Sequence, residues 1–110
     1  MNVSELVASL NAKTLVFTVT AGRSGTMLLT TLLRESLGVH AEHEPAPRVN
    51  FVLRSFINAP EATRNWLVYE KLPAILERSE GPIYVETSHL FCKSLIEPML
   101  KLGLRPKFII

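Results

Sequence analysis

The chain has little of three features that would each point to a class of protein: cysteine, net charge and long apolar runs. Its single cysteine, Cys92, excludes an internal disulfide and says nothing of compartment. The net charge of +2 is too small to indicate binding to nucleic acid or to an anionic membrane surface. No stretch approaches the roughly eighteen apolar residues of a membrane span, and residues 1–13 lack the basic and apolar regions of a signal peptide. We therefore expect a soluble, cytoplasmic protein with no nucleic-acid or membrane partner.

The chain is organised around residues 15–33, LVFTVTAGRSGTMLLTTLL. Residues 15–19 form an apolar run typical of a strand covered on both faces. A glycine-bearing loop follows, and from Thr26 leucines recur at helical spacing, as a stripe expected to face the core, until Gly38 ends the helix. A strand that passes through glycines into a helix N-terminus presents backbone N–H groups and the positive end of the helix dipole. This stretch predicts a site for an anion such as phosphate, unless the glycines serve only the turn.

The residues of the loop decide which phosphate ligand it suits. The nucleotide-hydrolase loop G-x-x-x-x-G-K-[ST] needs a lysine and a metal-binding hydroxyl, and Thr26 and Met27 stand in those positions. Residues 22–26, GRSGT, with the leucines that follow, resemble the 5′-phosphosulfate-binding loop of the sulfotransferase family. Those enzymes use PAPS (3′-phosphoadenosine 5′-phosphosulfate) as sulfuryl donor and no metal. The resemblance implies that the cofactor is bound by Gly22, Arg23, Ser24, Gly25, Thr26 and Met27.

Helical and strand patterns alternate along the rest of the chain. Helical patterns cover residues 2–12 (with Ser4 as N-cap), 49–57, 60–76 and 90–102. Short strands are expected at 39–44 (running out into a loop), at 83–85 and at 107–110. Pro60 suits the first position of its helix, and Pro73 should kink or restart that helix. The alternation predicts an α/β fold with a parallel sheet and helices on both faces. The resemblance implies the P-loop NTPase-like, three-layer form of that fold.

The chain stops on the apolar residues 108–110, where a parallel strand is normally followed by a crossover helix. In the family that the chain resembles, this strand leads into a second motif that binds the 3′-phosphate of the cofactor. We therefore expect residues 1–110 to be one domain, the N-terminal portion of a sulfotransferase-like domain, truncated after its third strand.

Transfer to a hydroxyl acceptor needs a base, and two candidate catalytic residues stand at the ends of predicted strands. Glu44 resembles, by its position after the loop, the glutamate base of carbohydrate and tyrosine sulfotransferases. His89, in Glu-Thr-Ser-His-Leu, is similar to the histidine base in the Lys-Thr-His-Leu segment of small-molecule sulfotransferases, although Glu86 replaces the lysine and one residue is inserted. The arginine in the loop favours the first branch and hence Glu44. Both residues also have plain structural interpretations, as a solvated loop carboxylate and as part of a polar helix cap.

Residues 40–44, HAEHE, invite a metal interpretation, but they match neither H-E-x-x-H nor H-x-x-E-H. On a strand, His40 and His43 would face opposite sides. We expect no metal here, and consider that His43 and Arg48 line the acceptor pocket. Trp66 and Tyr69, at helical spacing, are expected in the core.

These inferences predict an enzyme that transfers a sulfuryl group from PAPS to a hydroxyl or amine of a small-molecule, carbohydrate or other acceptor, giving PAP and a sulfated product. A nucleotide kinase or NTPase-like P-loop protein is one alternative, against which Thr26 and Met27 argue. A non-catalytic phosphate-binding module is the other, because so short a chain lacks the second phosphate motif.

Overall fold

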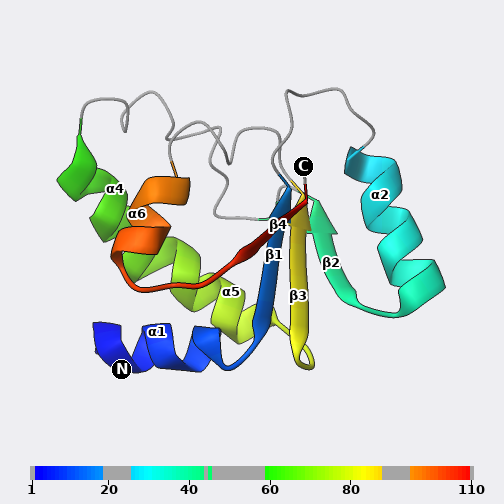
Figure 1. Cartoon of the computed structure of the whole chain (residues 1–110), viewed down its shortest axis with the longest axis horizontal. Coiled ribbons are helices and arrows are strands. Elements are labelled where there is room, and N and C mark those ends of the chain that lie inside the picture. The colour runs from blue at the N-terminus through cyan, green and yellow to red at the C-terminus, as the bar shows by residue number, and fades with distance from the viewer. Residues whose placement is uncertain (1, 19–25, 44, 46–58, 88–94, 110) are drawn as a thin grey trace.

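The strand predicted at residues 15–19 is β1 (Thr14–Thr18), which lies inside a parallel sheet in the computed structural model (Figure 1). The structure describes residues 2–18, 26–43, 45, 59–87 and 95–109. The other strands within these ranges are β2 (His40–His43), β3 (Ile83–Thr87) and β4 (Lys107–Ile109). β1 pairs with β3 and β4, and β3 pairs with β2, all in parallel, so the order is β2-β3-β1-β4. The predicted α/β class with a parallel sheet is confirmed.

The number of strands differs from the expectation of a sheet that stops at a third strand. The short strand expected at residues 39–44 is present as the edge strand β2, so the described residues form four strands rather than three. Only Ala41 of β2 is buried, opposite Val85 of β3, and its other residues are half-buried. An edge strand needs only a short apolar contact to join a sheet, because backbone hydrogen bonds to the neighbouring strand supply the rest.

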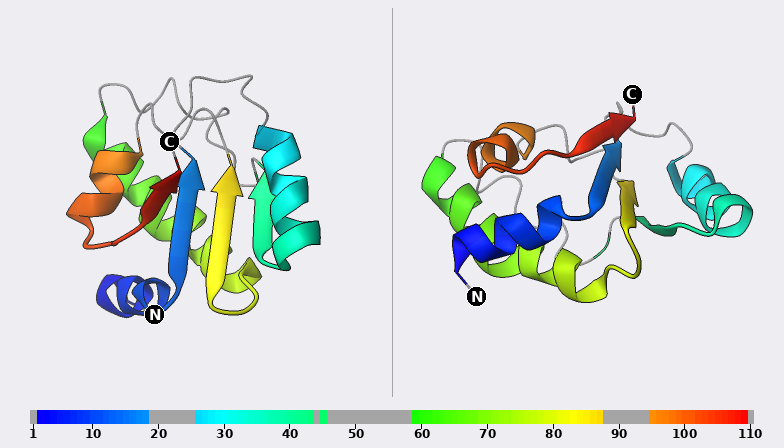
Figure 2. Two further views of the ribbon diagram at one scale, coloured as in Figure 1. Left: turned by 45° about the vertical axis from the view of Figure 1, so that its right-hand side comes forward. Right: turned by 60° about the horizontal axis from the view of Figure 1, so that its bottom comes forward.

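Helices cover both faces of the sheet (Figure 2). On one face lies α2 (Thr26–Leu32), which continues into a π-helical turn, η1 (Leu33–Leu37). Gly38 ends this helix with a φ of 66°, the left-handed conformation expected of a helix-ending glycine. On the opposite face lie the other helices of the described ranges, α1 (Val3–Asn11), α4 (Pro60–Trp66), η3 (Leu67–Lys71), α5 (Leu72–Arg78) and α6 (Ile96–Lys101).

Residues 60–78 form one continuous helical segment that Pro73 does not break. The helix begins at Pro60, as predicted, and changes to a π-helical turn at η3, directly before the second proline. The backbone N–H of Leu72 donates to the carbonyl of Leu67, five residues earlier, which is the π-helical pattern. Since Pro73 has no N–H to donate, the wider turn lies where a regular α-helix would already lack one hydrogen bond.

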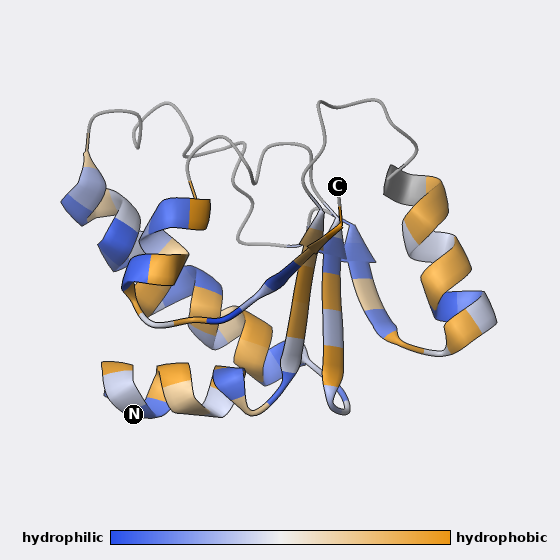
Figure 3. Cartoon of the chain, viewed as in Figure 1, coloured by the Kyte–Doolittle hydropathy of each residue, from blue (hydrophilic) through white to orange (hydrophobic). Residues whose placement is uncertain are grey.

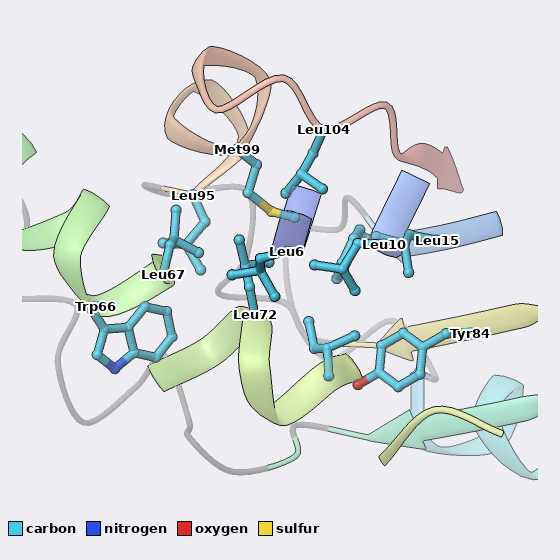
Figure 4. Close-up of a cluster of buried hydrophobic side chains, with 12 residues drawn as sticks. Leu6, Leu10, Leu15, Trp66, Leu67, Leu72, Tyr84, Leu95, Met99 and Leu104 are labelled. Carbon is cyan, nitrogen blue, oxygen red and sulfur yellow. The ribbon is translucent and has the colours of Figure 1, made fainter. Parts of the chain in front are cut away.

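The main hydrophobic core lies between the sheet and the layer that contains α1 (Figure 4). Leu6 and Leu10 of α1 are buried in it, as their spacing predicts, although the N-cap of α1 is Asn2 rather than Ser4. Trp66 is 6% exposed, as expected, whereas Tyr69 is 72% exposed, so its predicted core position is wrong. The buried apolar set is Leu6, Leu10, Leu15, Phe17, Trp66, Leu67, Leu72, Ile75, Tyr84, Leu95, Met99 and Leu104.

The α2 layer is packed differently from the prediction of an apolar stripe facing the core. Leu28 and Leu32 are more than half exposed, and among residues 28–32 the buried side chain is that of the polar Thr30. Figure 3 shows the apolar residues of α2 as orange segments of its ribbon. None of the helices in the described part of the chain is long and apolar enough to cross a membrane.

Candidate functional site at the carboxyl edge of the sheet

Most of the predicted site residues lie outside the described residues, in the segments that leave the carboxyl ends of the strands. They are Gly22, Arg23, Ser24, Gly25, Glu44 and His89. Thr26 and Met27 are the first two residues of α2. The structure describes the last residues of the strands that precede these segments. They are Thr18 of β1, His43 of β2 and Thr87 of β3.

The order of the strands places a topological switch point between β1 and β3, which are neighbours in the sheet. After β1 the chain crosses over through α2 to β2, beyond β3; after β3 it crosses over through α6 to β4, beyond β1. The two connections therefore lead to opposite sides of the β1–β3 pair, and their helices α2 and α6 lie on opposite faces of the sheet (Figure 2). In open α/β sheets, ligands bind in the crevice that such a divergence creates. The predicted phosphate loop and His89 follow these two strands directly.

A hydrogen-bonded network of three side chains lies on the α2 face of this edge. The hydroxyl of Thr87 lies 2.7 Å from the hydroxyl of Thr30 on α2 and 2.9 Å from Nδ1 of His43 on β2. Thr87 is fully buried and Thr30 is 2% exposed, whereas His43 is half-buried. The network ties together the three elements from which the predicted loop, Glu44 and His89 extend.

A buried ion pair lies on the opposite face, one residue earlier in β3. Nζ of Lys71 lies 3.0 Å from Oε1 of Glu86, and both residues are 2% exposed. The same carboxylate oxygen accepts a hydrogen bond of 3.0 Å from the hydroxyl of Tyr84, and Lys71 also donates to the carbonyl of Pro45 at 3.4 Å. Lys71 thus joins β3 to the residue that follows the predicted base, Glu44.

Burial controls the protonation of this cluster. Removal of the carboxylate from water raises the pKa of Glu86, while the ammonium group of Lys71 opposes that rise. Burial and the neighbouring carboxylate raise the pKa of Tyr84, so its phenol stays protonated and donates. The sequence motif identifies Glu86 only as the residue that replaces the lysine of the Lys-Thr-His-Leu segment, and it does not predict Lys71 as its partner. Lys71, which together with Glu70 interrupts the apolar helical run LVYEKL, was the available signal.

His40 and Glu42 of the HAEHE segment are hydrogen-bonded to each other and to neighbouring residues. Nε2 of His40 lies 3.0 Å from Oε1 of Glu42, and Nδ1 of His40 accepts from the backbone N–H of Glu80 at 3.0 Å. Arg34 of η1 lies 3.4 Å from the same carboxylate, in a shallow polar hollow at the edge of β2. His40 lies against Tyr84 and His43 against Thr87, so the two histidines face opposite sides of the sheet. Within the described ranges, no group of three or more metal-ligating side chains lies close enough together to hold an ion.

A parallel sheet between two helical layers defines an open α/β domain. Comparison of the chain with models of protein families, with curated proteins and with solved structures finds no match.

Proposed function

We propose that this chain carries the donor-binding part of a PAPS-dependent sulfotransferase with a P-loop-like fold. The observation that carries the proposal is the segment of residues 22–26, GRSGT, which joins the inner strand β1 to the start of α2. The helical segment 26–37 begins directly after the loop, so its first backbone N–H groups point back toward the carboxyl edge of the sheet. Those groups, the hydroxyls of the loop and the guanidinium of Arg23 suit a 5′-phosphate.

The proposed reaction is the transfer of a sulfuryl group to a hydroxyl or amine acceptor; PAPS, when bound, supplies that group and departs as PAP. Charge stabilisation and positioning dominate such in-line transfers. Arg23 keeps its charge at any working pH and offers a bidentate fork to phosphate oxygens. Glu44 and His89 are the candidate bases named by the resemblance, and both follow strands that end at this edge.

Two alternative functions would use the same loop, and they can be distinguished by the ligand that each would bind. A kinase or NTPase would bind Mg-ATP, although Thr26 and Met27 replace the lysine and hydroxyl that such a site uses. A phosphate-binding module would bind PAP and transfer nothing.

The proposal is tested by thermal-shift titration of the full chain with PAP and no metal, beside a titration with Mg-ATP. A ligand that binds only the folded state stabilises it by about 2.7 kcal/mol at a hundredfold excess over Kd. We expect PAP to raise the melting temperature, Arg23→Ala to abolish the rise, and Arg105→Ala to leave it unchanged. Arg105 is a matched control because it is exposed and precedes β4, at the amino edge of the sheet. A rise with Mg-ATP alone would support the kinase function instead.

A further inference from the structure

At the carboxyl edge of the sheet, the Thr87 hydroxyl is hydrogen-bonded to side chains of two other elements, Thr30 of α2 and His43 of β2. Thr87 is opposite His43 in the register of β3 and β2, so both side chains leave the sheet on the α2 face. Thr30 reaches the same hydroxyl from α2, less than two turns after the predicted phosphate loop. Within the described ranges, the Thr87 hydroxyl also lies in position to donate to the carbonyl of Glu42, at a long 3.5 Å.

The protons available to this network decide which nitrogen of His43 carries hydrogen. A threonine hydroxyl has one proton to donate and can accept up to two. A threonine inside a helix can direct its proton to a carbonyl one turn earlier. A Thr30 hydroxyl that donates in that way can accept from Thr87, and the carbonyl of Glu42 can only accept. When the Thr87 proton goes to either of these two acceptors, Thr87 must accept from an Nδ1–H of His43. This direction leaves Nε2 of His43 as an unprotonated acceptor.

Nε2 of His43 forms no hydrogen bond to any side chain or backbone group in the described ranges. His43 is the last residue of β2, at the edge where ligands of open α/β sheets bind, and it is half-buried rather than enclosed. An imidazole held through one nitrogen, with a lone pair on the other, has the form of a general base.

We propose that His43 takes the proton of the acceptor hydroxyl, with Thr87 and Thr30 as positioning residues that fix its ring and tautomer. This inference rests on the proposed sulfuryl transfer. The acceptor oxygen forms a bond to sulfur while the bond between sulfur and the 5′-phosphate oxygen breaks. The electron pair of the broken bond leaves with that phosphate, and the acceptor proton moves to Nε2 of His43, giving the imidazolium ion. In this arrangement neither Glu44 nor His89 takes the proton.

The tautomer is tested without any activity, by long-range ¹H–¹⁵N correlation NMR of the full chain at a pH where His43 is neutral. We expect the Nδ1–H form in the wild type and in Thr87→Ser, which keeps the hydroxyl. Thr87→Val, which has nearly the same shape and no oxygen, should lose it. A neutral His43 with its proton on Nε2 in the wild type would overturn the assignment, and this measurement requires no variant to fold.

The role in transfer is tested with His43→Asn, because the asparagine amide can replace Nδ1–H toward Thr87 while Nε2 is removed. The assay follows radiolabelled sulfate from PAPS to a panel of a phenol, an alkyl alcohol and an amino sugar. We expect kcat to fall by about 10²–10⁴-fold, with the PAP-induced thermal shift retained. His40→Asn, on the same strand but the opposite face, should keep the wild-type rate.

The outcomes separate this inference from the function on which it rests. Wild-type transfer with an unchanged rate in His43→Asn would overturn the role of His43 and leave the sulfotransferase function in place. Loss of transfer in Glu44→Gln or His89→Asn, with full transfer in His43→Asn, would assign the base to those residues instead. Binding of PAP with no transfer to any acceptor would overturn the role of His43 and favour the phosphate-binding module. Failure of the wild type to bind PAP would overturn both proposals, whatever the tautomer.

Discussion

Substitution of Lys71 by methionine tests how the buried ion pair supports the carboxyl edge. Methionine keeps most of the aliphatic stem of lysine and removes the ammonium group. Among the residues that the structure describes, the carboxylate of Glu86 then keeps the Tyr84 hydroxyl as its one partner, at 3.0 Å, and the carbonyl of Pro45 loses its bond to Nζ. Because Glu86 is 2% exposed, water cannot easily replace the lost charge.

Removal of one partner from a buried ion pair costs about 3–5 kcal/mol, because the remaining charge is left in a medium of low polarity. Protonation of Glu86 limits this cost, because a neutral carboxyl group no longer leaves an unpaired charge in the core. Burial already raises the pKa of Glu86, and protonating the group costs about 1.36 kcal/mol for each unit by which the pH exceeds its pKa. We therefore expect a loss of about 3 kcal/mol near pH 7 and a smaller loss at pH 5. For a chain of this size, the corresponding fall in melting temperature is about 12 °C.

The measurement is urea unfolding followed by circular dichroism at pH 5 and pH 7, with Lys101→Met as the matched control. Lys101 forms a pair of nearly the same length with Glu97, at 2.9 Å, but both side chains are more than 70% exposed. The control should unfold at nearly the wild-type urea concentration, because water screens an exposed pair. The double variant Lys71→Met/Glu86→Gln should recover part of the loss. Equal effects of Lys71→Met and Lys101→Met would refute the reasoning that burial makes the pair matter.

Two further predictions concern stability. The pKa of Glu86 is raised on folding, so the folded state binds more protons and this group's contribution to stability falls as pH rises from its usual pKa through the raised one. The free energy of unfolding of wild type minus that of Glu86→Gln, from urea titrations across that window, should therefore decrease with pH; a constant difference would contradict the assignment. Gly38→Ala should cost about 1 kcal/mol, and Gly38→Asn less, because φ is 66° and an added Cβ would meet nothing within 4 Å. Thermal melts in which both variants match the wild type would show that the left-handed residue is dispensable.

The elements that the sequence predicts well are those marked by local signals. Gly38 and Pro60 mark helix boundaries because backbone conformation at these two positions depends on the residue itself. The apolar run of β1 is equally local, since a strand between two neighbours must be apolar on both faces. Such features need no knowledge of what packs against them.

The π-helical turn shows why the predicted core positions on the long helix were partly wrong. Leu67 and Leu72 are both fully buried although they are five residues apart. In a regular α-helix that spacing turns two side chains to different sides, whereas across a π-turn they lie one above the other. The extra residue in the turn rotates Tyr69 to solvent and brings Lys71 into the buried face. An α-helical period applied across the whole segment cannot produce this arrangement.

The loop motif of the candidate site can be read from the sequence, whereas the side-chain contacts beside it can be seen only in the folded structure. The loop motif is readable because phosphate recognition depends on a few adjacent residues, such as Arg23 and Gly25. The partners of Glu86 and Thr87 are not readable, because they come from elements far away in sequence that meet only in the folded sheet. These two neighbouring residues point to opposite faces, and each is held by a different helical layer, so the end of β3 is fixed from both sides.

The order of the strands sets the distance between the two groups that the proposed reaction needs, the bound anion and the base. Neighbouring strands lie about 4.8 Å apart, so the end of β2 lies about 10 Å from the end of β1, with β3 between them. An anion held by the loop after β1 and a base at the end of β2 are therefore separated by roughly the span of a sulfuryl group and an acceptor hydroxyl. Thr87, on β3, lies between the two and is hydrogen-bonded to Thr30 of α2 and to His43 of β2. Loss of its hydroxyl should therefore disturb the orientation of the base while the Lys71–Glu86 pair on the other face continues to hold the strand.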